Sequence, residues 1–465
     1  MAVHLAFTDW SLVDSELRLE LSSEPHGSHL VQDGTPVLLD DSLWPMEPWS
    51  SFLRTYGQST SDNTLRAYGR DAHQFARYLD ARGIRLQDVE HQILVDYRDH
   101  RFAQGISQRT WGRELVVIRA LFNYVIQIGL RQDLPWIQVG RYSVANPRMT
   151  HQEMDVRALS KEQWEAFRRV GLGGELPDGS MDPAFRGRET GRDVTAAELA
   201  LTTGMRLQEW SSLLTLELPE RTDAGATVYL EATAKNQRRR AVYIPSGTMR
   251  IVDLYRATER AELIRRAQKG LVARRSELAV VESIDHGGGR LRYRVGGVVH
   301  KKVLERIPVG HRRVLVEDRD GVIEPLSLFL GRGGLPPSRR SWHAKFHSAN
   351  RRLTGFREEL PGMPTAVTPH DLRHTFAVVL LRSLQRRALE HESTRQKVGT
   401  GTISEHIMFN PLLTLQRLMG HASPSTTMVY LRYVDESHEL IQRAFEQWDD
   451  PLLEYADYVL NDMGR

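Results

Sequence analysis

The sequence predicts a mostly α-helical protein of more than one domain, in which a helical domain precedes a mixed α/β domain with small β elements. Apolar residues recur at helical spacing through much of residues 61–126. After residue 160, helical stretches alternate with short runs that follow the two-residue period of strands, as in residues 226–245. At 465 residues and 40% hydrophobic content, the chain can bury the cores of two or three domains.

Composition excludes several classes of protein. The chain has no cysteine, which rules out a disulfide framework and Cys-based metal sites and fits a reducing compartment. Its first residues lack a positive segment ahead of an apolar one, and no run approaches the roughly 18 apolar residues of a membrane span. We therefore expect a globular intracellular protein with no membrane segment.

Charge is distributed unevenly along the chain. Residues 1–47 contain nine acids and one Arg, a net charge of −8. Residues 48–465 therefore carry a net charge of +11, which gives the overall +3. A basic body of this kind is typical of proteins that bind a phosphate backbone. Of the 62 basic residues only seven are Lys, which indicates a GC-rich bacterial genome or mobile element and makes each Lys position informative.

Four stretches follow from this pattern. Residues 1–47 are predicted to form an acidic, weakly ordered arm, 48–140 a helical domain, 141–158 an exposed linker and 159–465 the mixed domain. Within 48–140, helices are expected from near Ser61 to Gly83, over 86–103, and from Ser107 to Gly129. Their polar faces could contact phosphates or could simply be solvated. The candidate DNA contacts there are Arg66, Arg70, Arg109 and Arg113.

The mixed domain holds the first candidate site in the string TAAELALTTGMRLQE. A helix from about Thr195 breaks at Gly204 and resumes at Arg206. A cation at the start of a helix faces the positive end of the helix dipole, which is unfavourable unless an anion also lies there. Glu209, three residues on, either orients the Arg206 guanidinium or forms an ordinary surface ion pair.

The string ATVYLEATAKNQRRRAVYIP predicts a β-hairpin with Lys235 at its tip. One of the seven lysines is thus placed on an exposed loop. The alternative is an ordinary basic hairpin that touches nucleic acid or solvent. Further candidate DNA contacts follow it directly: Arg238, Arg239 and Arg240.

The string TPHDLRH predicts a capped helix start with His370 and Arg373 on one face, three residues apart. Thr368 suits the cap and Pro369 the first helical position. An imidazole beside a bidentate phosphate clamp suits phosphoryl transfer, although a polar first turn is also common without any such role.

The string GHASPSTTMVY places His421 in a tight turn after Gly420 and Tyr430 about two turns into the next helix, which Ser423 would cap. A tyrosine hydroxyl has an ordinary pKa of ~10, so it is a poor nucleophile at neutral pH unless cations or a base assist it. Tyr433, one turn later, is expected to pack.

Together these motifs resemble the tyrosine recombinase, or phage integrase, family. That family has an Arg in a TG-x-R-x-x-E segment, a Lys on a β-hairpin, an H-x-x-R pair, and a GH turn with a Tyr nine residues after the His. The same elements occur here in the same order, as TGMRLQE, Lys235, HDLRH and GHASPSTTMVY. The resemblance covers roughly residues 50–440 and implies a core-binding domain followed by a catalytic domain that closes around duplex DNA.

The resemblance also implies roles for these residues. Arg206 and Arg373 would hold the scissile phosphate, with Glu209 supporting the former and His421 donating a hydrogen bond. Tyr430 would attack to give a 3′-phosphotyrosyl link, Lys235 would protonate the leaving 5′ oxygen, and His370 would act as acid or base near the nucleophile. The family uses no metal or nucleotide cofactor, works as a tetramer on two DNA duplexes, and often has accessory proteins. These expectations place the protein in a bacterial cytoplasm, at the nucleoid.

Spacing departs from the family in two places. Between Lys235 and His370 lie 134 residues, and the surplus at about 257–325 is expected to be a strand-rich insertion with a turn at 287–289. Between Arg373 and His421 lie 47 residues, of which 386–404 are expected to form a polar loop. The apolar stripe in 440–448 suits a C-terminal helix that packs on its own domain or on a neighbouring protomer.

The sequence is also compatible with two other functions. A type IB topoisomerase would use the same phosphotyrosine chemistry, and a DNA-binding protein could keep the fold without catalysis. The helical domain and the spacing from His421 to Tyr430 favour a recombinase, and none of the six motif residues is missing. His343 and His347 lie four residues apart but lack a third ligand of clear spacing, so no metal site is expected.

Overall fold

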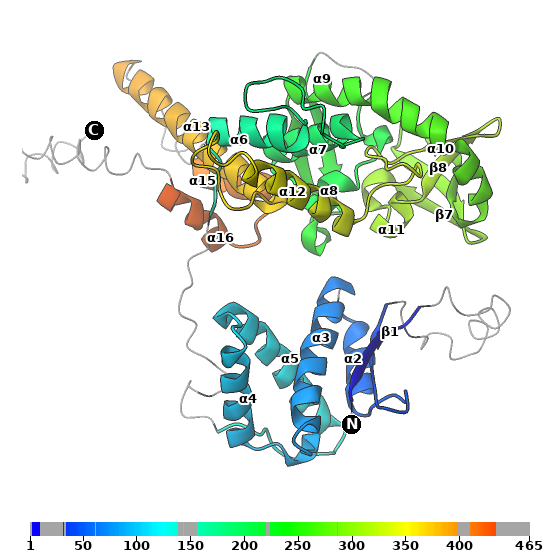
Figure 1. Ribbon diagram of the computed structural model, residues 1–465, viewed down its shortest axis with the longest axis vertical. Helices are drawn as coiled ribbons and strands as arrows, with labels where there is room; N and C mark the ends of the chain where they lie inside the picture. The colour runs from blue at the N-terminus through cyan, green and yellow to red at the C-terminus, as the bar shows by residue number, and fades with distance from the viewer. Residues whose placement is uncertain are drawn as a thin grey trace, which may run out of the picture. The chain divides into compact units, whose positions relative to one another are not determined.

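The computed structural model divides the chain into two compact units, 1–152 and 153–465, which are described separately below (Figure 1). The structure describes residues 2–9, 31, 34–60, 62–137, 143, 156–219, 224–285, 287–398 and 410–433. Among these residues, no helix is both long and apolar enough to cross a membrane.

The N-terminal unit is a helical domain with an aromatic core. Three of its helices were expected from sequence periodicity, and a fourth, α2, was not, because its few apolar residues lie beside prolines that indicated an irregular segment. The helices are α2 (Trp49–Gly57), α3 (Asp62–Asp80), α4 (His91–Ala103) and α5 (Gln108–Gln127). Ser107 caps α5 as expected by accepting from the Thr110 amide at 3.2 Å. Buried aromatic residues include Phe52, Phe75, Tyr97, Trp111 and Phe122.

The prediction of a weakly ordered arm over 1–47 is wrong at both ends of the arm. Strand β1 (His4–Phe7) pairs antiparallel with β2 (Pro36–Leu39), and the pair packs on α2 and α3. Leu38 is fully buried, so its apolar side chain contributes to the helical core. The two short apolar runs lie about 30 residues apart in an acidic segment. Neither run alone therefore indicated a pair of strands.

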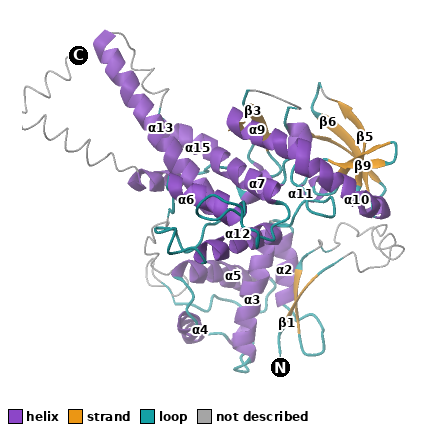
Figure 2. Cartoon of the chain, turned by 45° about the horizontal axis from the view of Figure 1, so that its top comes forward, coloured by secondary structure: helices purple, strands orange, loops and turns teal. Residues whose placement is uncertain are grey.

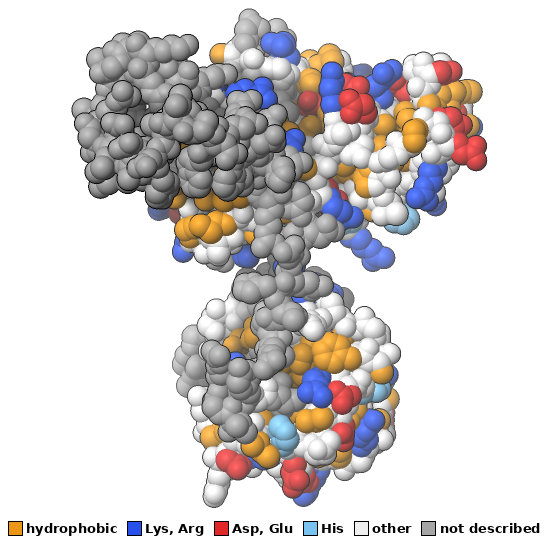
Figure 3. Space-filling model, turned by 90° about the vertical axis from the view of Figure 1, so that its left-hand side faces the viewer, with side chains coloured by type: hydrophobic (Ala, Val, Ile, Leu, Met, Phe, Trp, Pro, Cys, Tyr) orange, Lys and Arg blue, Asp and Glu red, His pale blue; other side chains and the backbone are white. Residues whose placement is uncertain are grey.

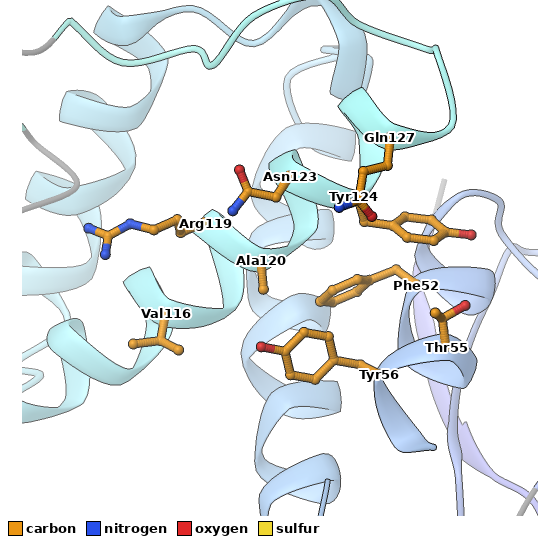
Figure 4. Close-up of a pocket in the computed structure, with 9 residues that line it drawn as sticks. All are labelled: Phe52, Thr55, Tyr56, Val116, Arg119, Ala120, Asn123, Tyr124 and Gln127. Carbon is orange, nitrogen blue, oxygen red and sulfur yellow. The ribbon is translucent and has the colours of Figure 1, made fainter. Parts of the chain in front are cut away.

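A pocket of about 320 Å³ lies between α2 and α5 (Figure 4). Figure 4 shows the rings of Phe52 and Tyr56 from α2 beside Tyr124 from α5. None of the predicted catalytic residues lines it. The pocket is therefore a feature of the N-terminal unit and not part of the candidate active site.

The C-terminal unit is mostly helical, with two small sheets (Figure 2). Its core contains Trp210 and Trp342, whose ring centroids are 4.8 Å apart. Its helices are α6 (Lys161–Ala166), α7 (Thr190–Thr203), α8 (Leu207–Ser211), α9 (Ser246–Tyr255), α10 (Ala261–Ala273), α11 (Val309–Arg312), α12 (Arg339–Thr354), α13 (Pro369–Val398), α15 (Pro411–Met419) and α16 (Pro424–Met428).

One sheet is the predicted hairpin and the other lies in the predicted insertion. Strands β3 (Ala226–Leu230) and β4 (Arg240–Ile244) pair antiparallel. The second sheet has the order β7-β6-β5-β8-β9, with β5 and β8 parallel and the other pairs antiparallel. Its strands are β5 (Ala279–Asp285), β6 (Arg290–Val295), β7 (Val298–Val303), β8 (Leu315–Arg319) and β9 (Val322–Pro325). The start of the stretch 257–325 is helical, since α10 occupies 261–273.

Two further expectations need correction. The predicted polar loop 386–404 is helical as far as Val398, because α13 continues through a run rich in Arg, Gln, Leu, Ala and Glu, all good helix formers (Figure 1). The end of the predicted linker is also structured: Val156 is buried against α13 and α15 in a cluster that includes Tyr430. The predicted C-terminal stripe at 440–448 lies outside the described residues.

Candidate active site

A sharp turn between α7 and α8 positions Arg206. Gly204 ends α7 with φ of 62°, and a Cβ there would lie 2.2 Å from a ring carbon of Phe376, so the turn requires glycine. Arg206 then becomes the N-cap of α8. Glu209 accepts hydrogen bonds from the Arg206 backbone amide at 2.6 Å and from its Nη1 at 3.1 Å. Because only 1% of the Glu209 side chain is exposed, it orients the guanidinium and is no surface ion pair.

Arg240, predicted to contact DNA, instead lies inside the site and binds Glu209. Its Nη1 and Nη2 donate to the two Glu209 carboxylate oxygens at 2.8 Å each, and its Nε donates to the Leu418 carbonyl at 3.2 Å. Burial raises the pKa of Glu209, but the hydrogen bonds and charge of Arg240, and then the charge of Arg206, outweigh it and keep that pKa below its usual value. Strand alternation could have revealed this position, since Arg240 shares a face of β4 with the buried Val242 and Ile244.

We predict that Arg240→Met lowers the rate of strand cleavage about 30-fold to 100-fold without weakening DNA binding. Glu209 would then be a buried carboxylate whose remaining partner is Arg206, and it would hold that guanidinium away from the substrate. Adding Glu209→Gln to Arg240→Met removes this competing charge and should restore part of the rate. The measurement is single-turnover cleavage at saturating DNA. Equal rates for the single and double variants would contradict this account.

Arg373 is the most deeply placed cation of the site, with 2% exposure. It donates to the carbonyl oxygens of Gly204 and, at 2.5 Å, Met419. Burial, together with the nearby charge of Arg206, lowers the pKa of Arg373 to about 9, so the guanidinium stays protonated at neutral pH. The guanidinium groups of Arg206 and Arg373 are near enough for one to lower the pKa of the other, and this arrangement favours binding of an anion.

His421 lies beside Arg373 in the turn that Gly420 begins. Arg373 Nη2 donates to His421 Nε2 at 3.4 Å, so His421 Nδ1 carries the ring proton and donates to Thr427 Oγ1 at 2.8 Å. Burial, then the charges of Arg373 and Arg206, lowers the pKa of His421 to about 3. The imidazole is therefore neutral until a negative charge enters the site.

Tyr430 lies in a 3₁₀ turn, Val429–Tyr433, since α16 ends at Met428 and not beyond Tyr430 as expected. Its hydroxyl is hydrogen bonded to Nδ1 of His374 at 2.9 Å, and only 1% of the residue is exposed. Burial raises the pKa of Tyr430 more than the positive charges of Arg373 and Arg206 lower it. The phenol is therefore protonated at neutral pH. The side chain of Tyr433 lies outside the described residues.

Sequence analysis missed His374, the last residue of HDLRH. His370 and Arg373 show the three-residue spacing of one helix face, whereas His374 faces the buried side of α13. His370 itself is exposed, and its ring centroid lies 4.2 Å from that of His374. Burial, and then the charges of His370 and Arg373, lowers the pKa of His374 to about 3, which leaves Nδ1 free to accept the Tyr430 proton in the hydrogen bond.

The low pKa of His374 predicts that the protein loses stability as the pH falls. In the unfolded chain a histidine titrates near 6.5, so between pH 6.5 and 3 the unfolded state binds more protons at this position. Stability present above pH 6.5 is therefore lost on acidification, by up to about 2 kcal/mol from His374 at pH 5. We expect the melting temperature to fall between pH 7 and pH 5, and to fall less in His374→Phe. Parallel curves for the two proteins would contradict the prediction.

Lys235 is exposed in the connection between β3 and β4, where residues 235–237 form a 3₁₀ turn. Arg240 lies at the β4 end of the same connection, so the loop of Lys235 is attached directly to the Glu209 cluster. Arg239 lies over the Tyr229 ring at 4.5 Å, and Arg238 is exposed. The structure thus brings Arg206, Glu209, Arg373, His421 and Tyr430 together in one largely buried cluster, with Lys235 on the loop attached to it.

The predicted DNA contacts of the N-terminal unit differ in their surroundings. Arg113 binds the buried carboxylate of Asp71 through Nε and Nη2 at 2.7 and 2.8 Å, so it also stabilises the contact between α5 and α3. Arg66, Arg70 and Arg109 are exposed. In the C-terminal unit, His343 and His347 are exposed on α12, and the described residues contain no group of three or more metal-ligating side chains.

Comparison with known proteins agrees with the family that the motifs indicated. A family model of the phage integrase N-terminal SAM-like domain matches residues 50–129, the segment that contains α2 to α5. Tyrosine recombinase XerD of Shewanella oneidensis is 26% identical over 242 residues, which cover 51% of this chain and 70% of that protein. Tyrosine recombinase XerC of Brucella melitensis is 24% identical over 394 residues, 83% of this chain and 88% of that protein. The chain is therefore similar to tyrosine recombinases over most of its length.

Solved recombinase structures are also similar to this chain. XerH site-specific recombinase, bound to palindromic difH substrate in a post-cleavage complex, is 15% identical, with 88% of this chain and 92% of that chain covered and a TM-score of 0.47. The family model matches residues 50–129 within the N-terminal unit, whereas the motif residues lie in the C-terminal unit.

Proposed function

We propose that this protein is a tyrosine recombinase that cuts and rejoins duplex DNA at specific sites, with Tyr430 as the nucleophile. The observation that carries the proposal is the charge of the buried cluster. Arg206, Arg240 and Arg373 contribute +3 and Glu209 contributes −1, a net charge of +2 next to the Tyr430 hydroxyl. A phosphodiester has the charge and the oxygen geometry that such guanidinium groups bind.

The chemistry follows from the positions of the side chains. Arg206 and Arg373 would bind the non-bridging oxygens of the phosphate and stabilise the charge that builds in the transition state. His421 would gain a proton as the phosphate enters and donate a hydrogen bond to the same oxygens. The Tyr430 oxygen forms a bond to phosphorus as the bond to the 5′ oxygen breaks. Lys235 gives a proton to that oxygen, which leaves a 3′-phosphotyrosyl link and a free 5′ hydroxyl. The Tyr430 proton leaves through the hydrogen bond to Nδ1 of His374, and His370, whose ring lies against that of His374, acts as acid or base on the same side.

The wider reaction needs duplex DNA and several protomers. The exposed Arg66, Arg70, Arg109 and Arg238 are our candidates for DNA contacts. Exchange between two duplexes requires four active sites, so we propose a homotetramer on DNA, with accessory proteins that set the direction of the reaction. A substrate of this kind places the recombinase at the bacterial nucleoid in the cytoplasm.

Cleavage, strand-exchange and plasmid-relaxation assays test this function. Nicked duplexes from the attachment region are incubated with the protein in EDTA, and the products are resolved on denaturing gels. A second, unlabelled duplex reports strand exchange. We expect a covalent protein-DNA product and recombinant strands. Relaxation of supercoiled plasmid without recombinants would instead support a topoisomerase, and binding without any cleavage would support a non-catalytic protein.

A further inference from the structure

The inserted sheet contacts the loop of Lys235 on both of its flanks. The contact is made by the 3₁₀ turn Leu304–Arg306, which directly follows β7. Before Lys235, the Ala232 amide donates to the Glu305 carbonyl at 2.8 Å and Arg306 Nε donates to Glu231 Oε1 at 2.9 Å. After it, Arg239 Nη2 donates to Glu305 Oε1 at 3.3 Å.

The turn itself is anchored to the catalytic core by a buried arginine. Arg312, with 1% exposure, donates to the carbonyl oxygens of Leu304, at 2.5 Å, and Ile307, at 3.0 Å. The same guanidinium binds both Glu217 carboxylate oxygens at 2.8 Å and the Ser212 carbonyl at 3.1 Å. Ser212 directly follows α8, the helix that carries Glu209. A continuous set of hydrogen bonds therefore runs from the segment after α8, through the insertion, to the loop of Lys235.

These contacts are better suited to holding the loop of Lys235 in one position than to stabilising the fold. The side chains of Arg306 and Arg239 are 64% and 55% exposed, and ion pairs at such exposure contribute about 0–1 kcal/mol each. Restricting a loop of nine residues, 231–239, on both flanks instead reduces the number of positions that its exposed Lys235 can sample.

We propose that the inserted sheet is a brace that holds the loop of Lys235 in place for protonation of the leaving 5′ oxygen, with Glu305 and Arg306 as positioning residues. This inference rests on the proposed function. The proton passes from the Lys235 ammonium to the 5′ oxygen as its bond to phosphorus breaks, and the brace takes no part in that exchange of atoms.

The outer face of the sheet is less suited to the alternative role of binding DNA. Arg292 and Arg294 on β6 both pair with Glu282 on β5, at 2.7 Å each. Figure 3 shows another side of the molecule, the one at the left of Figure 1, where Lys and Arg side chains also lie near Asp and Glu side chains. DNA binding by the insertion is therefore kept as an outcome of the test.

The test uses two nicked substrates that differ in the bridging atom of the scissile phosphate. With a 5′ oxygen the leaving group needs a proton, whereas a 5′ sulfur leaves as a thiolate because a thiol is far more acidic than an alcohol. Arg306→Glu opposes Glu231 and should lower cleavage of the oxygen substrate about tenfold while changing that of the sulfur substrate less than about twofold. Lys235→Met should give the same pattern with a larger loss.

Three controls keep the outcomes distinct. The exchanged pair Arg306→Glu with Glu231→Arg should regain most of the rate, and Glu282→Gln on the outer face of the sheet should leave it unchanged. Equal losses on both substrates, or none on the oxygen substrate, would overturn the brace, as would a loss confined to DNA affinity. If the wild type forms no covalent product with either substrate, or if sulfur does not rescue Lys235→Met, the proposed function fails instead.

Discussion

Tyr430→Phe is expected to abolish the covalent protein-DNA product while DNA binding stays within about twofold of the wild type. The hydroxyl is the atom that forms the bond to phosphorus, and no other group on the ring can replace it. The ring packs among Ala377, Leu381, Leu415 and Met419, and phenylalanine preserves that packing. Loss of the hydrogen bond to His374 should lower the free energy of unfolding by about 1 kcal/mol.

The matched control is Tyr433→Phe, three residues later in the same 3₁₀ turn. It should form the covalent product at close to the wild-type rate. The covalent product is measured with the nicked duplexes on denaturing gels, and DNA binding is measured separately by electrophoretic mobility. A covalent product that persists in Tyr430→Phe and disappears in Tyr433→Phe would transfer the nucleophile to Tyr433.

Arg373→Met is expected to lower the cleavage rate at saturating DNA about 10³-fold. The guanidinium lies at the centre of the site, where it contacts His421 and the carbonyls of Gly204 and Met419. Its position in a buried, electropositive cluster makes its charge costly in the DNA-free protein, as its lowered pKa indicates. A phosphate compensates that charge and becomes tightly bound.

Stability should change far less than the rate in Arg373→Met. Two carbonyls lose a donor, which destabilises the fold, but a poorly solvated charge is also removed, which stabilises it. Arg382→Met, an exposed position on the same helix, is the control and should cleave at the wild-type rate. If Arg373→Met cleaved DNA within tenfold of the wild type, Arg373 would not be the phosphate clamp.

Local chemistry made much of the site predictable from sequence. Gly204 and Gly420 end their helices with positive φ, and Thr368 and Ser423 begin theirs, as the residue types indicated. These signals act within a few residues, so they also placed Arg373 near the start of α13. The order of the motifs predicts the resemblance to tyrosine recombinases without any knowledge of contacts.

Contacts between distant segments could not be predicted in the same way. Arg240 reaches Glu209 across 31 positions of sequence, and His374 reaches Tyr430 across 56. His374 lies next to Arg373, which already matched a motif, and the one local signal for Arg240 was its place on the buried face of β4. The pairing of β1 with β2 was hidden for the same reason, and α13 extends beyond Arg386 because helix propensity outweighs a polar composition.

The most direct test of the account is to locate the DNA on the protein. The covalent product is trapped with a nicked substrate in EDTA, digested with trypsin and nuclease, and the modified peptide is sequenced by tandem mass spectrometry. The account predicts a nucleotide attached to Tyr430 through the 3′ phosphate, in the peptide that follows Arg417 and ends at Arg432. Attachment to any other residue, or through a 5′ phosphate, would contradict the mechanism.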